Sequence, residues 1–284
     1  MLGCHLSIAG GVHNALRLAA ELRADCLQIF TTNQRQWAGR DISRDELANW
    51  QHAREQGNLR SIVSHGSYLL NLASPDVGLR RRSIAALDQE LGRCELLGLS
   101  AVVIHPGSHM GAGVDAGLAR VARSLNLLAR RRGASPVSVC LEITAGQGDG
   151  VGWRLEQLRW VLDHVHSPAR VAVCLDTAHL LAAGYDLTTG AAAQGVLDEV
   201  DRIVGLDRVQ AVHLNDSKAP LGSRVDRHEH IGYGQIALDA FAAFINHPQL
   251  RKVPQVLETP KEIAPDGRPW DVVNLETLRS LERS

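Results

Sequence analysis

The feature that most constrains the fold is a regular alternation of short apolar segments with longer amphipathic ones. Eight segments have the length and composition of buried strands, at residues 2–7, 26–31, 61–65, 101–105, 137–142, 171–176, 209–213 and 255–258. Helical periodicity follows each of them, at residues 15–23, 44–56, 79–97, 118–131, 155–166, 191–204, 238–246 and 271–282. Eight strand–helix units in succession predict an α/β fold, a closed parallel (β/α)8 TIM barrel.

Length and composition are consistent with this architecture. The chain has 284 residues, and no linker or shift in composition divides it, so we expect residues 1–284 to form a single domain. The net charge is −1, which excludes a bulk electrostatic attraction to nucleic acid; a DNA contact would need a local basic patch. No apolar run reaches the roughly 18 residues of a membrane span, and no signal peptide is evident. We therefore expect a cytoplasmic protein.

Side chains that can bind metal ions end six consecutive predicted strands, from the third to the eighth. They are His65, His105, Glu142, Asp176, His213 and Glu258. Because barrel active sites lie at the carboxyl ends of the strands, these side chains are expected to converge at one mouth. Crowded carboxylates repel one another unless cations neutralise them. One such residue alone is more often a helix cap or a buried hydrogen-bonding group, but six in succession indicate a metal site.

Three further candidate ligands lie beyond the strand ends. His179 follows Asp176 by three residues, on the predicted turn into the next helix. Asp226 and His228 lie two residues apart in a long polar loop after the seventh strand. In an extended segment their side chains point to the same side and can hold one cation. Considered alone, that loop could equally be an ordinary solvated surface segment.

The nine candidates comprise five imidazoles and four carboxylates, with no cysteine. This set fits catalytic zinc or manganese better than a structural zinc site, which is typically rich in cysteine. Catalytic zinc uses about three protein ligands, so nine ligands with one shared carboxylate suit three metal ions. Such a cluster suits phosphodiester hydrolysis, because metal ions generate hydroxide near neutral pH and stabilise the attacking and leaving oxygens.

Eight longer motifs extend the pattern over nearly the whole chain. In order they are TTNQRQW (31–37), HGSYLLNLASP (65–75), HPGSH (105–109), EITAGQG (142–148), CLDTAHLLAAGYD (174–186), HLNDSK (213–218), SRVDRHEHIGYG (223–234) and LETP (257–260). Together they resemble the endonuclease IV family, the zinc-dependent apurinic/apyrimidinic endonucleases. Two positions, Gly66 and Ile143, depart from residues that some members of that family carry, namely aspartate and asparagine.

The resemblance implies how the nine ligands divide among three zinc ions. One ion would take His65, His105 and Glu142; a second would share Glu142 and take Asp176, His213 and Glu258; a third would take His179, Asp226 and His228. Manganese in one or more of these sites is compatible with the same ligands. Glu142 would bridge two ions, and Glu258 would also help to orient the attacking hydroxide, so these two are the candidate catalytic residues.

The resemblance also implies how DNA is held. Arg35, Tyr68 and Leu69 match positions that push into the duplex at the lesion, where a nucleotide that has lost its base is easily displaced. The alternative for Tyr68 and Leu69 is ordinary packing. Hydrogen bonds to phosphates are expected from Asn33, Gln34 and Ser67, whose alternative role is turn capping, and ionic contacts from Lys218, Arg224 and Arg227.

The expected activity is base-excision-repair cleavage of the phosphodiester 5′ to abasic sites in duplex DNA, giving a 3′-hydroxyl and a 5′-deoxyribose phosphate. The family also implies removal of blocking groups from 3′ ends, and we expect a monomer with no membrane partner. Two alternatives stay open. One is a metal-dependent sugar isomerase or epimerase, although none of the six strand-end residues is the lysine that some of these enzymes use. The other is a barrel that binds damaged DNA or metal without cutting.

Overall fold

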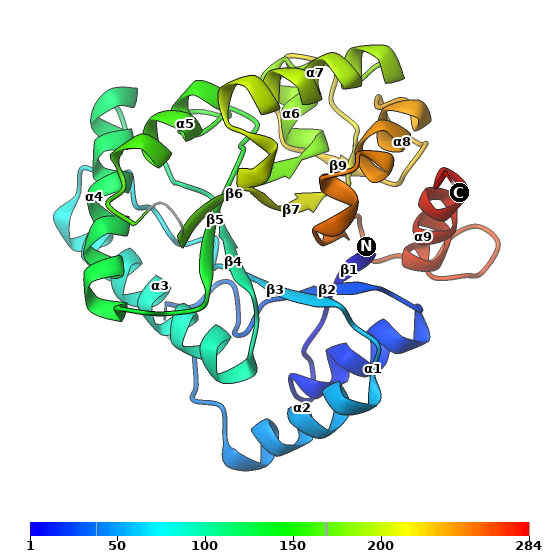
Figure 1. The fold of residues 1–284 in the computed structure, drawn as a ribbon, viewed down its shortest axis with the longest axis horizontal. Helices are drawn as coiled ribbons and strands as arrows, with labels where there is room; N and C mark the ends of the chain where they lie inside the picture. The colour runs from blue at the N-terminus through cyan, green and yellow to red at the C-terminus, as the bar shows by residue number, and fades with distance from the viewer. Residues whose placement is uncertain (38, 168–169, 284) are drawn as a thin grey trace.

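The structure, a computed structural model, describes residues 1–37, 39–167 and 170–283. Parallel strands close into a barrel in the order β1, β10, β7, β6, β5, β4, β3, β2 (Figure 1). The strands are β1 (Leu2–Leu6), β2 (Cys26–Ile29), β3 (Ser61–His65), β4 (Ala101–Ile104), β5 (Ser138–Glu142), β6 (Val171–Asp176), β7 (Val209–His213) and β10 (Gln255–Leu257). The barrel closes where β1 pairs with β10, with Leu2 opposite Gln255 and Cys4 opposite Leu257. The predicted TIM barrel is confirmed.

Helices surround the barrel on the outside (Figure 1). They are α1 (His13–Glu21), α2 (Arg44–Gln56), α3 (Val77–Leu97), α4 (Val114–Arg132), α5 (Leu155–His164), α6 (Thr177–Ala183), α7 (Gly190–Ile203), α8 (Leu238–Asn246) and α9 (Trp270–Ser280), with short 3₁₀ turns at Leu206–Arg208 and Leu250–Lys252. Helix α2 begins with a reciprocal capping box between Ser43 and Glu46. All eight predicted helices are present, with ends shifted by a few residues.

Helix α6 was not predicted, and it corrects the expected position of His179. The segment is seven residues long and almost uniformly apolar, so it carries no helical periodicity. Its first turn is held by the Asp176 carboxylate, which accepts a hydrogen bond from the His179 backbone N–H at 2.8 Å. Gly184, with φ of 107°, ends the helix. His179 therefore lies inside a helix and not on a turn.

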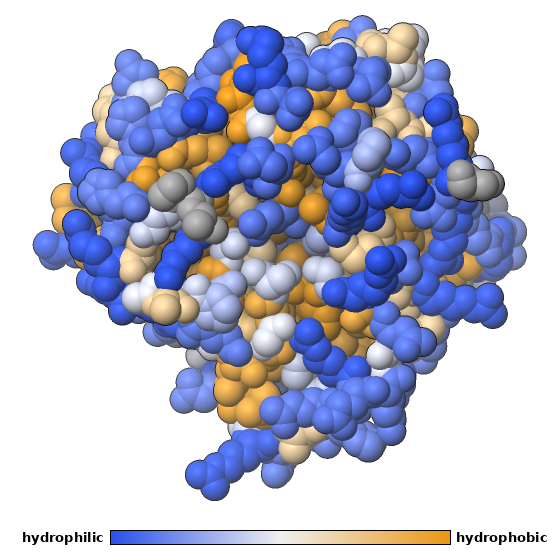
Figure 2. All heavy atoms as spheres, in the orientation of Figure 1, coloured by the Kyte–Doolittle hydropathy of each residue, from blue (hydrophilic) through white to orange (hydrophobic). Residues whose placement is uncertain are grey.

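Two hydrophobic regions stabilise the fold. The larger lies between the barrel and the helices, and the smaller fills the barrel interior with Val63, Ala101, Val103, Cys140, Ala172, Cys174 and Ala211. All five cysteines are buried and free. The face shown in Figure 2 is largely hydrophilic, with hydrophobic side chains between the polar ones. Within the described residues, no helix combines the length and apolar character needed to cross a bilayer.

The long loop after β7 is organised around the buried carboxylate of Asp216. A short antiparallel ladder joins β8 (Asp216–Ser217) to β9 (His228–Glu229). One oxygen of Asp216 accepts hydrogen bonds from the backbone N–H groups of Gly232 at 3.0 Å and Gly234 at 2.9 Å. The other accepts from Ser217 at 2.7 Å and Ile236 at 2.9 Å. The loop that carries Asp226 and His228 is therefore anchored at both ends.

We expect Asp216→Ala to lower the free energy of unfolding by about 2–4 kcal/mol, because it leaves buried N–H groups without an acceptor. Chemical denaturation measures this loss. The matched control is Asp198→Ala on α7, where the exposed carboxylate accepts a hydrogen bond from Gln194, and it should change stability by less than about 0.5 kcal/mol. Equal effects of the two substitutions would contradict the anchoring role of Asp216.

Candidate metal centre

The barrel brings the six strand-end side chains to one mouth. His65, Glu142, Asp176 and His213 are the last residues of β3, β5, β6 and β7, whereas His105 and Glu258 follow the last residues of β4 and β10. The strands predicted to end at His105 and Glu258 thus end one residue earlier, at Ile104 and Leu257. Both side chains still lie at the same end of the barrel. Parallel strands in a closed barrel present their carboxyl ends on the same side. The six side chains consequently share one space.

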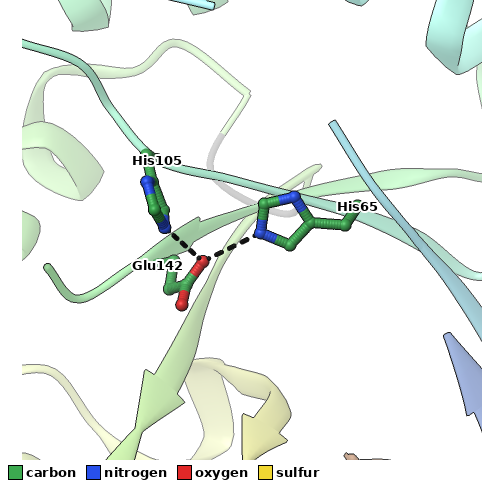
Figure 3. Close-up of side chains that lie close together, drawn as sticks. All are labelled: His65, His105 and Glu142. Carbon is green, nitrogen blue, oxygen red and sulfur yellow. Dashed lines mark hydrogen bonds and ion pairs between the residues drawn. The ribbon is translucent and has the colours of Figure 1, made fainter. Parts of the chain in front are cut away.

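The Glu142 carboxylate lies at the centre of this space. Its Oε2 lies 3.1 Å from His65 Nε2 and 3.0 Å from His105 Nε2, and Figure 3 shows both rings directed at that oxygen. Its Oε1 lies 3.1 Å from the Nδ1 atoms of both His179 and His213. A single carboxylate thus contacts four imidazoles that come from four different strand–helix units.

A second group surrounds the other side of Glu142. It consists of Glu142, Asp176, His213 and Glu258, whose ligand atoms all lie within 4.8 Å of one another. His213 Nδ1 lies 3.1 Å from Glu258 Oε2 and 3.7 Å from Asp176 Oδ2. Three carboxylates this close are unfavourable unless positive charge is shared among them. The group can hold a divalent cation.

A third group lies beside α6. Asp176, His179 and His228 have ligand atoms within 4.8 Å of one another. Asp226 completes it, because its two oxygens lie 3.2 Å from His179 Nε2 and 3.3 Å from His228 Nε2. The geometric groups follow the division that the resemblance implies, except that Asp176 contributes to the third group as well as to the second.

The ring of His228 provides a direct test of whether this donor set fits a cation. Its Nε2 is buried and has no hydrogen-bond partner among the described residues, although Asp226 Oδ1 is 3.3 Å away and Asp176 Oδ2 is 3.7 Å away. Its Nδ1 faces the carbonyl of Glu258 at 3.4 Å. A buried polar atom without a partner is costly. A divalent cation between this nitrogen and the two carboxylates would satisfy it, so the residues fit a metal ion.

Backbone carbonyls orient two of the candidate ligand rings. The carbonyl of Gly66 accepts a hydrogen bond from His65 Nδ1 at 2.8 Å, and the carbonyl of Ile143 accepts one from His179 Nδ1 at 2.9 Å. Because a carbonyl only accepts, each Nδ1 carries a hydrogen, and Nε2 is the ring nitrogen left to face the site. Gly66 and Ile143 are the two positions that depart from some family members, and both act here through their backbones.

Two buried amides that sequence reasoning missed hold the second group in place. Gln28 Nε2 donates to Glu258 Oε1 at 2.5 Å, and Gln28 Oε1 accepts from His213 Nε2 at 2.9 Å. Asn215 Nδ2 donates to Asp176 Oδ2 at 2.7 Å, and Asn215 Oδ1 accepts from the Glu258 N–H at 2.8 Å. A polar residue inside an otherwise apolar strand was the only sequence signal for Gln28.

Charge in the mouth is stabilised by close pairing of acids and imidazoles. Burial alone would raise the pKa of Glu142, but the imidazoles of His105 and His213 hold that pKa well below its usual value. Burial likewise opposes ionisation of Glu258, and His213 keeps its pKa well below the usual value. Both carboxylates therefore remain anionic, which is the form that binds cations.

Tyr68 lies on the rim of the mouth and is 62% exposed. Its ring centroid lies 5.9 Å from that of His65 and 5.6 Å from that of Phe30, and Leu69 beside it is half-buried. Core packing, the alternative considered for this pair, does not describe Tyr68. Its exposed ring lies beside the rings of His65 and His105.

The loop that carries Arg35 is joined to the loop that carries Tyr68. The Ser67 hydroxyl donates to the carbonyl of Gln34 at 2.7 Å. The side chain of Asn33 accepts a hydrogen bond from the Arg35 N–H at 2.9 Å, so Asn33 closes a turn, as the alternative interpretation had it. Arg35 is exposed. The two loops form one rim segment beside the mouth.

The other basic residues expected to contact phosphates come from the loop after β7. Lys218, Arg224 and Arg227 are all exposed. Lys218 Nζ lies 3.6 Å from Glu229 Oε2, and the guanidinium of Arg227 donates to the carbonyl of Asp226 at 2.7 Å. An open cleft of about 600 Å³ lies between the rims, and its lining includes Tyr68, Leu69, His105, Gln147, His179 and Asp226.

Comparison with known proteins gives three results of high coverage. The sequence profile of a family described as a xylose isomerase-like TIM barrel matches residues 16–281. A protein from Geobacter sulfurreducens named probable endonuclease 4 is 43% identical over 282 residues, which is 99% of this chain and 94% of that protein. The crystal structure of endonuclease IV from Thermus thermophilus superposes with a TM-score of 0.86 at 39% identity, over 99% of this chain and 98% of that one.

Sugar epimerases share the fold at much lower identity. A D-tagatose 3-epimerase-like protein superposes with a TM-score of 0.73 but is only 18% identical, over 98% of this chain and 96% of that one. This likeness concerns the barrel alone. The comparisons therefore separate a near group of endonucleases from a distant group that shares only the architecture.

We expect Gln28→Leu to weaken binding of Zn²⁺ at the mouth by about 10- to 100-fold, the usual effect of removing a residue that orients metal ligands. The substitution removes the partners of His213 and Glu258 while leaving both side chains present. Competition with a chromophoric chelator measures the affinity. Gln194→Leu on the exposed face of α7 is the matched control. Unchanged affinity in Gln28→Leu would show that Gln28 orients neither ligand.

Proposed function

The chain belongs to the endonuclease IV family of xylose isomerase-like TIM barrels, and on this basis we propose that it cleaves the phosphodiester 5′ to abasic sites in duplex DNA. The observation that carries the proposal is the convergence of nine imidazoles and carboxylates, in three groups, on one barrel mouth. The protein is an apurinic/apyrimidinic endonuclease, a hydrolase of DNA repair, with the whole chain acting as one catalytic domain.

The proposed ligand set distributes three zinc ions over the three groups, with manganese acceptable at one or more of them. Glu142 is shared between the first and second groups, and its two oxygens face different pairs of imidazoles, which supports a bridging role. When bound, the cations supply Lewis acidity that activates water and stabilises the charge of the reacting phosphate.

The protein's own side chains position the attacking water and the phosphodiester. Glu258, held by Gln28, faces the same space as Glu142 and orients the water that attacks phosphorus. The new bond joins the water oxygen to phosphorus, and the bond from phosphorus to the 3′ oxygen breaks. That oxygen takes up a proton, so the products are a 3′-hydroxyl and a 5′-deoxyribose phosphate. The same geometry accommodates phosphate esters that block 3′ ends.

Duplex DNA docks over the mouth in this proposal. Arg35, Tyr68 and Leu69 enter the duplex at the lesion, where no base opposes them. The hydrogen bond from Ser67 to the carbonyl of Gln34 joins the loop with Tyr68 and Leu69 to the loop with Arg35, which supports joint action of these residues. Asn33 and Gln34 directly precede Arg35 and add hydrogen bonds to phosphates, and the exposed side chains of Lys218, Arg224 and Arg227 supply ionic phosphate contacts. The protein acts as a cytoplasmic monomer.

A duplex oligonucleotide with a single stable abasic analogue tests the activity. We expect cleavage on its 5′ side, with a 3′ end that a DNA polymerase extends, and loss of cleavage after treatment with chelator. Glu142→Gln should abolish cleavage but retain DNA binding, because an amide is a poor bridge between cations and phosphate contacts lie elsewhere. Glu156→Gln, the same change at an exposed position of α5, should cleave normally. Near-normal turnover by Glu142→Gln would rule out the bridging role.

Metal content gives an independent measure of the site. We expect elemental analysis of gently purified protein to find close to three zinc or manganese ions per chain, following the three groups of ligands. Substitution of both Asp226 and His228 by alanine should lower the metal content by about one ion per chain, because these residues contribute to the third group alone. A content near one ion in the unaltered protein would instead favour a mononuclear isomerase-type site.

The double substitution Tyr68→Ala with Leu69→Ala separates lesion recognition from chemistry. Stacking contacts contribute about 1–3 kcal/mol per base, so cleavage of abasic duplex should fall by about ten- to a hundredfold. Removal of a 3′ blocking group at a frayed end needs less opening of the duplex and should fall less. Gel assays on both substrates measure the ratio, with metal content and melting temperature as controls. Equal losses on both substrates would show that the pair has no role in lesion recognition.

A further inference from the structure

Two arginine side chains stack on one tryptophan at the rim of the mouth. The Cζ atoms of Arg154 and Arg224 lie 4.5 Å and 4.4 Å from the ring centroid of Trp153. Trp153 and Arg154 directly precede α5, on the loop that follows β5, whereas Arg224 belongs to the loop after β7. The three side chains, which we name the Trp153 stack, thus join two loops from the carboxyl end of the barrel.

Neither guanidinium of the stack has a hydrogen-bond or ion-pair partner within the described part of the chain, and both arginines are exposed. Other arginines are paired differently: Arg132 contacts two carboxylates, at 2.6 Å and 2.8 Å. The indole ring attracts each guanidinium through its π face, but two cations on one ring repel each other. Phosphate anions bound to the guanidiniums would relieve this repulsion.

The backbone around the stack holds Arg224 in a defined position. Arg224 adopts φ of 53°, which is uncommon for a residue other than glycine, and its N–H donates to the carbonyl of Ala182 at 2.9 Å. Nearby, the N–H of Gly222 donates to the carbonyl of Leu181 at 2.9 Å. Both acceptors belong to α6, the helix that carries His179. The stack therefore has a fixed relation to the metal centre.

The indole ring is also held closely. A Cβ atom placed on Gly146 would lie 3.1 Å from Trp153, and the φ of 78° at Gly146 favours glycine for a second reason. The glycine thus lets the loop after β5 fold closely against Trp153. Because ring and guanidiniums are positioned in advance, less conformational freedom is lost when an anion binds.

We propose that the Trp153 stack binds backbone phosphates of duplex DNA, at positions outside the bond that is cut. This inference rests on the proposed function, since it assumes that duplex DNA docks over the mouth. The net charge of −1 gives no general attraction to DNA, and the carboxylates of the mouth repel phosphates. Local cations must supply the attraction. The planar guanidinium matches phosphate geometry with two parallel N–H donors.

The salt dependence of DNA binding tests the stack through a property that a purely structural residue would not change. Each phosphate contact contributes about 0.9 to the slope of log affinity against log salt concentration. Arg154→Ala and Arg224→Ala should each lower that slope by about 1, and the double variant by about 2, on intact and abasic duplexes. Arg130→Ala, an exposed arginine near the carboxyl end of α4, is the matched control and should leave the slope unchanged.

The role of the Trp153 ring as a platform that holds both arginines is tested by Trp153→Phe and Trp153→Ala. Phenylalanine retains an aromatic face, so it should preserve most of the slope, whereas alanine should lower it although no charge is removed. Metal content is measured alongside, because a retained complement shows that the loop with Asp226 is still in place. Equal slopes for the alanine variant and the unaltered protein would overturn the platform role.

Neutral methylphosphonate linkages, introduced one at a time along the duplex, locate the phosphates. At the contacted positions, the unaltered protein should lose affinity about tenfold, whereas the double arginine variant should lose almost none. If each methylphosphonate lowered the affinity of the double arginine variant as much as that of the unaltered protein, the stack proposal would be overturned. Arginine variants with unchanged salt slopes, in a protein that cleaves abasic duplex, would also overturn the stack proposal alone. If the arginine variants lowered the salt slope as expected but the unaltered protein failed to cleave abasic duplex, the stack proposal would be supported and the proposed function overturned.

Discussion

The structure depends on one carboxylate placed among four imidazoles. Glu142, at the end of β5, has two oxygens that each face a different pair of histidines. Its neighbours come from elements on both sides of β5, so the whole barrel must close correctly before these contacts exist. Burial disfavours an isolated anion, and the surrounding imidazoles make the charged form stable. The same arrangement places anionic oxygens and ring nitrogens where divalent cations can bind.

Around this centre, backbone and amide groups decide which nitrogen of each ring faces the site. The carbonyls of Gly66 and Ile143 hold two rings, and Gln28 holds a third. Because carbonyls are present whatever the side chain, the departures at positions 66 and 143 leave these two hydrogen bonds in place. At Gly66 a side chain would meet Ile104 and Leu70 at less than 3.0 Å, which explains why glycine suits this packing.

The rim and the metal centre form one continuous structure. Ser67 lies two residues after His65 and ties its loop to the loop with Arg35. On the opposite side, Arg224 lies two residues before Asp226 and is bound through its backbone to α6. Side chains that we propose to hold DNA are therefore connected by short covalent segments to candidate metal ligands. A displacement of either rim loop would shift a candidate ligand, which would link DNA binding to chemistry in the proposed function.

The sequence alone determined the barrel, because apolar strands followed by amphipathic helices recur eight times with ligand-type residues at six strand ends. Local patterns are sufficient for such elements, since burial and periodicity act over a few residues. Only the tertiary structure decided the roles of Gln28 and Asn215 and the stacking of Arg224 on Trp153. These contacts join segments far apart in the chain. Helix α6 also escaped prediction, because both of its faces are buried and its sequence therefore shows no polar side.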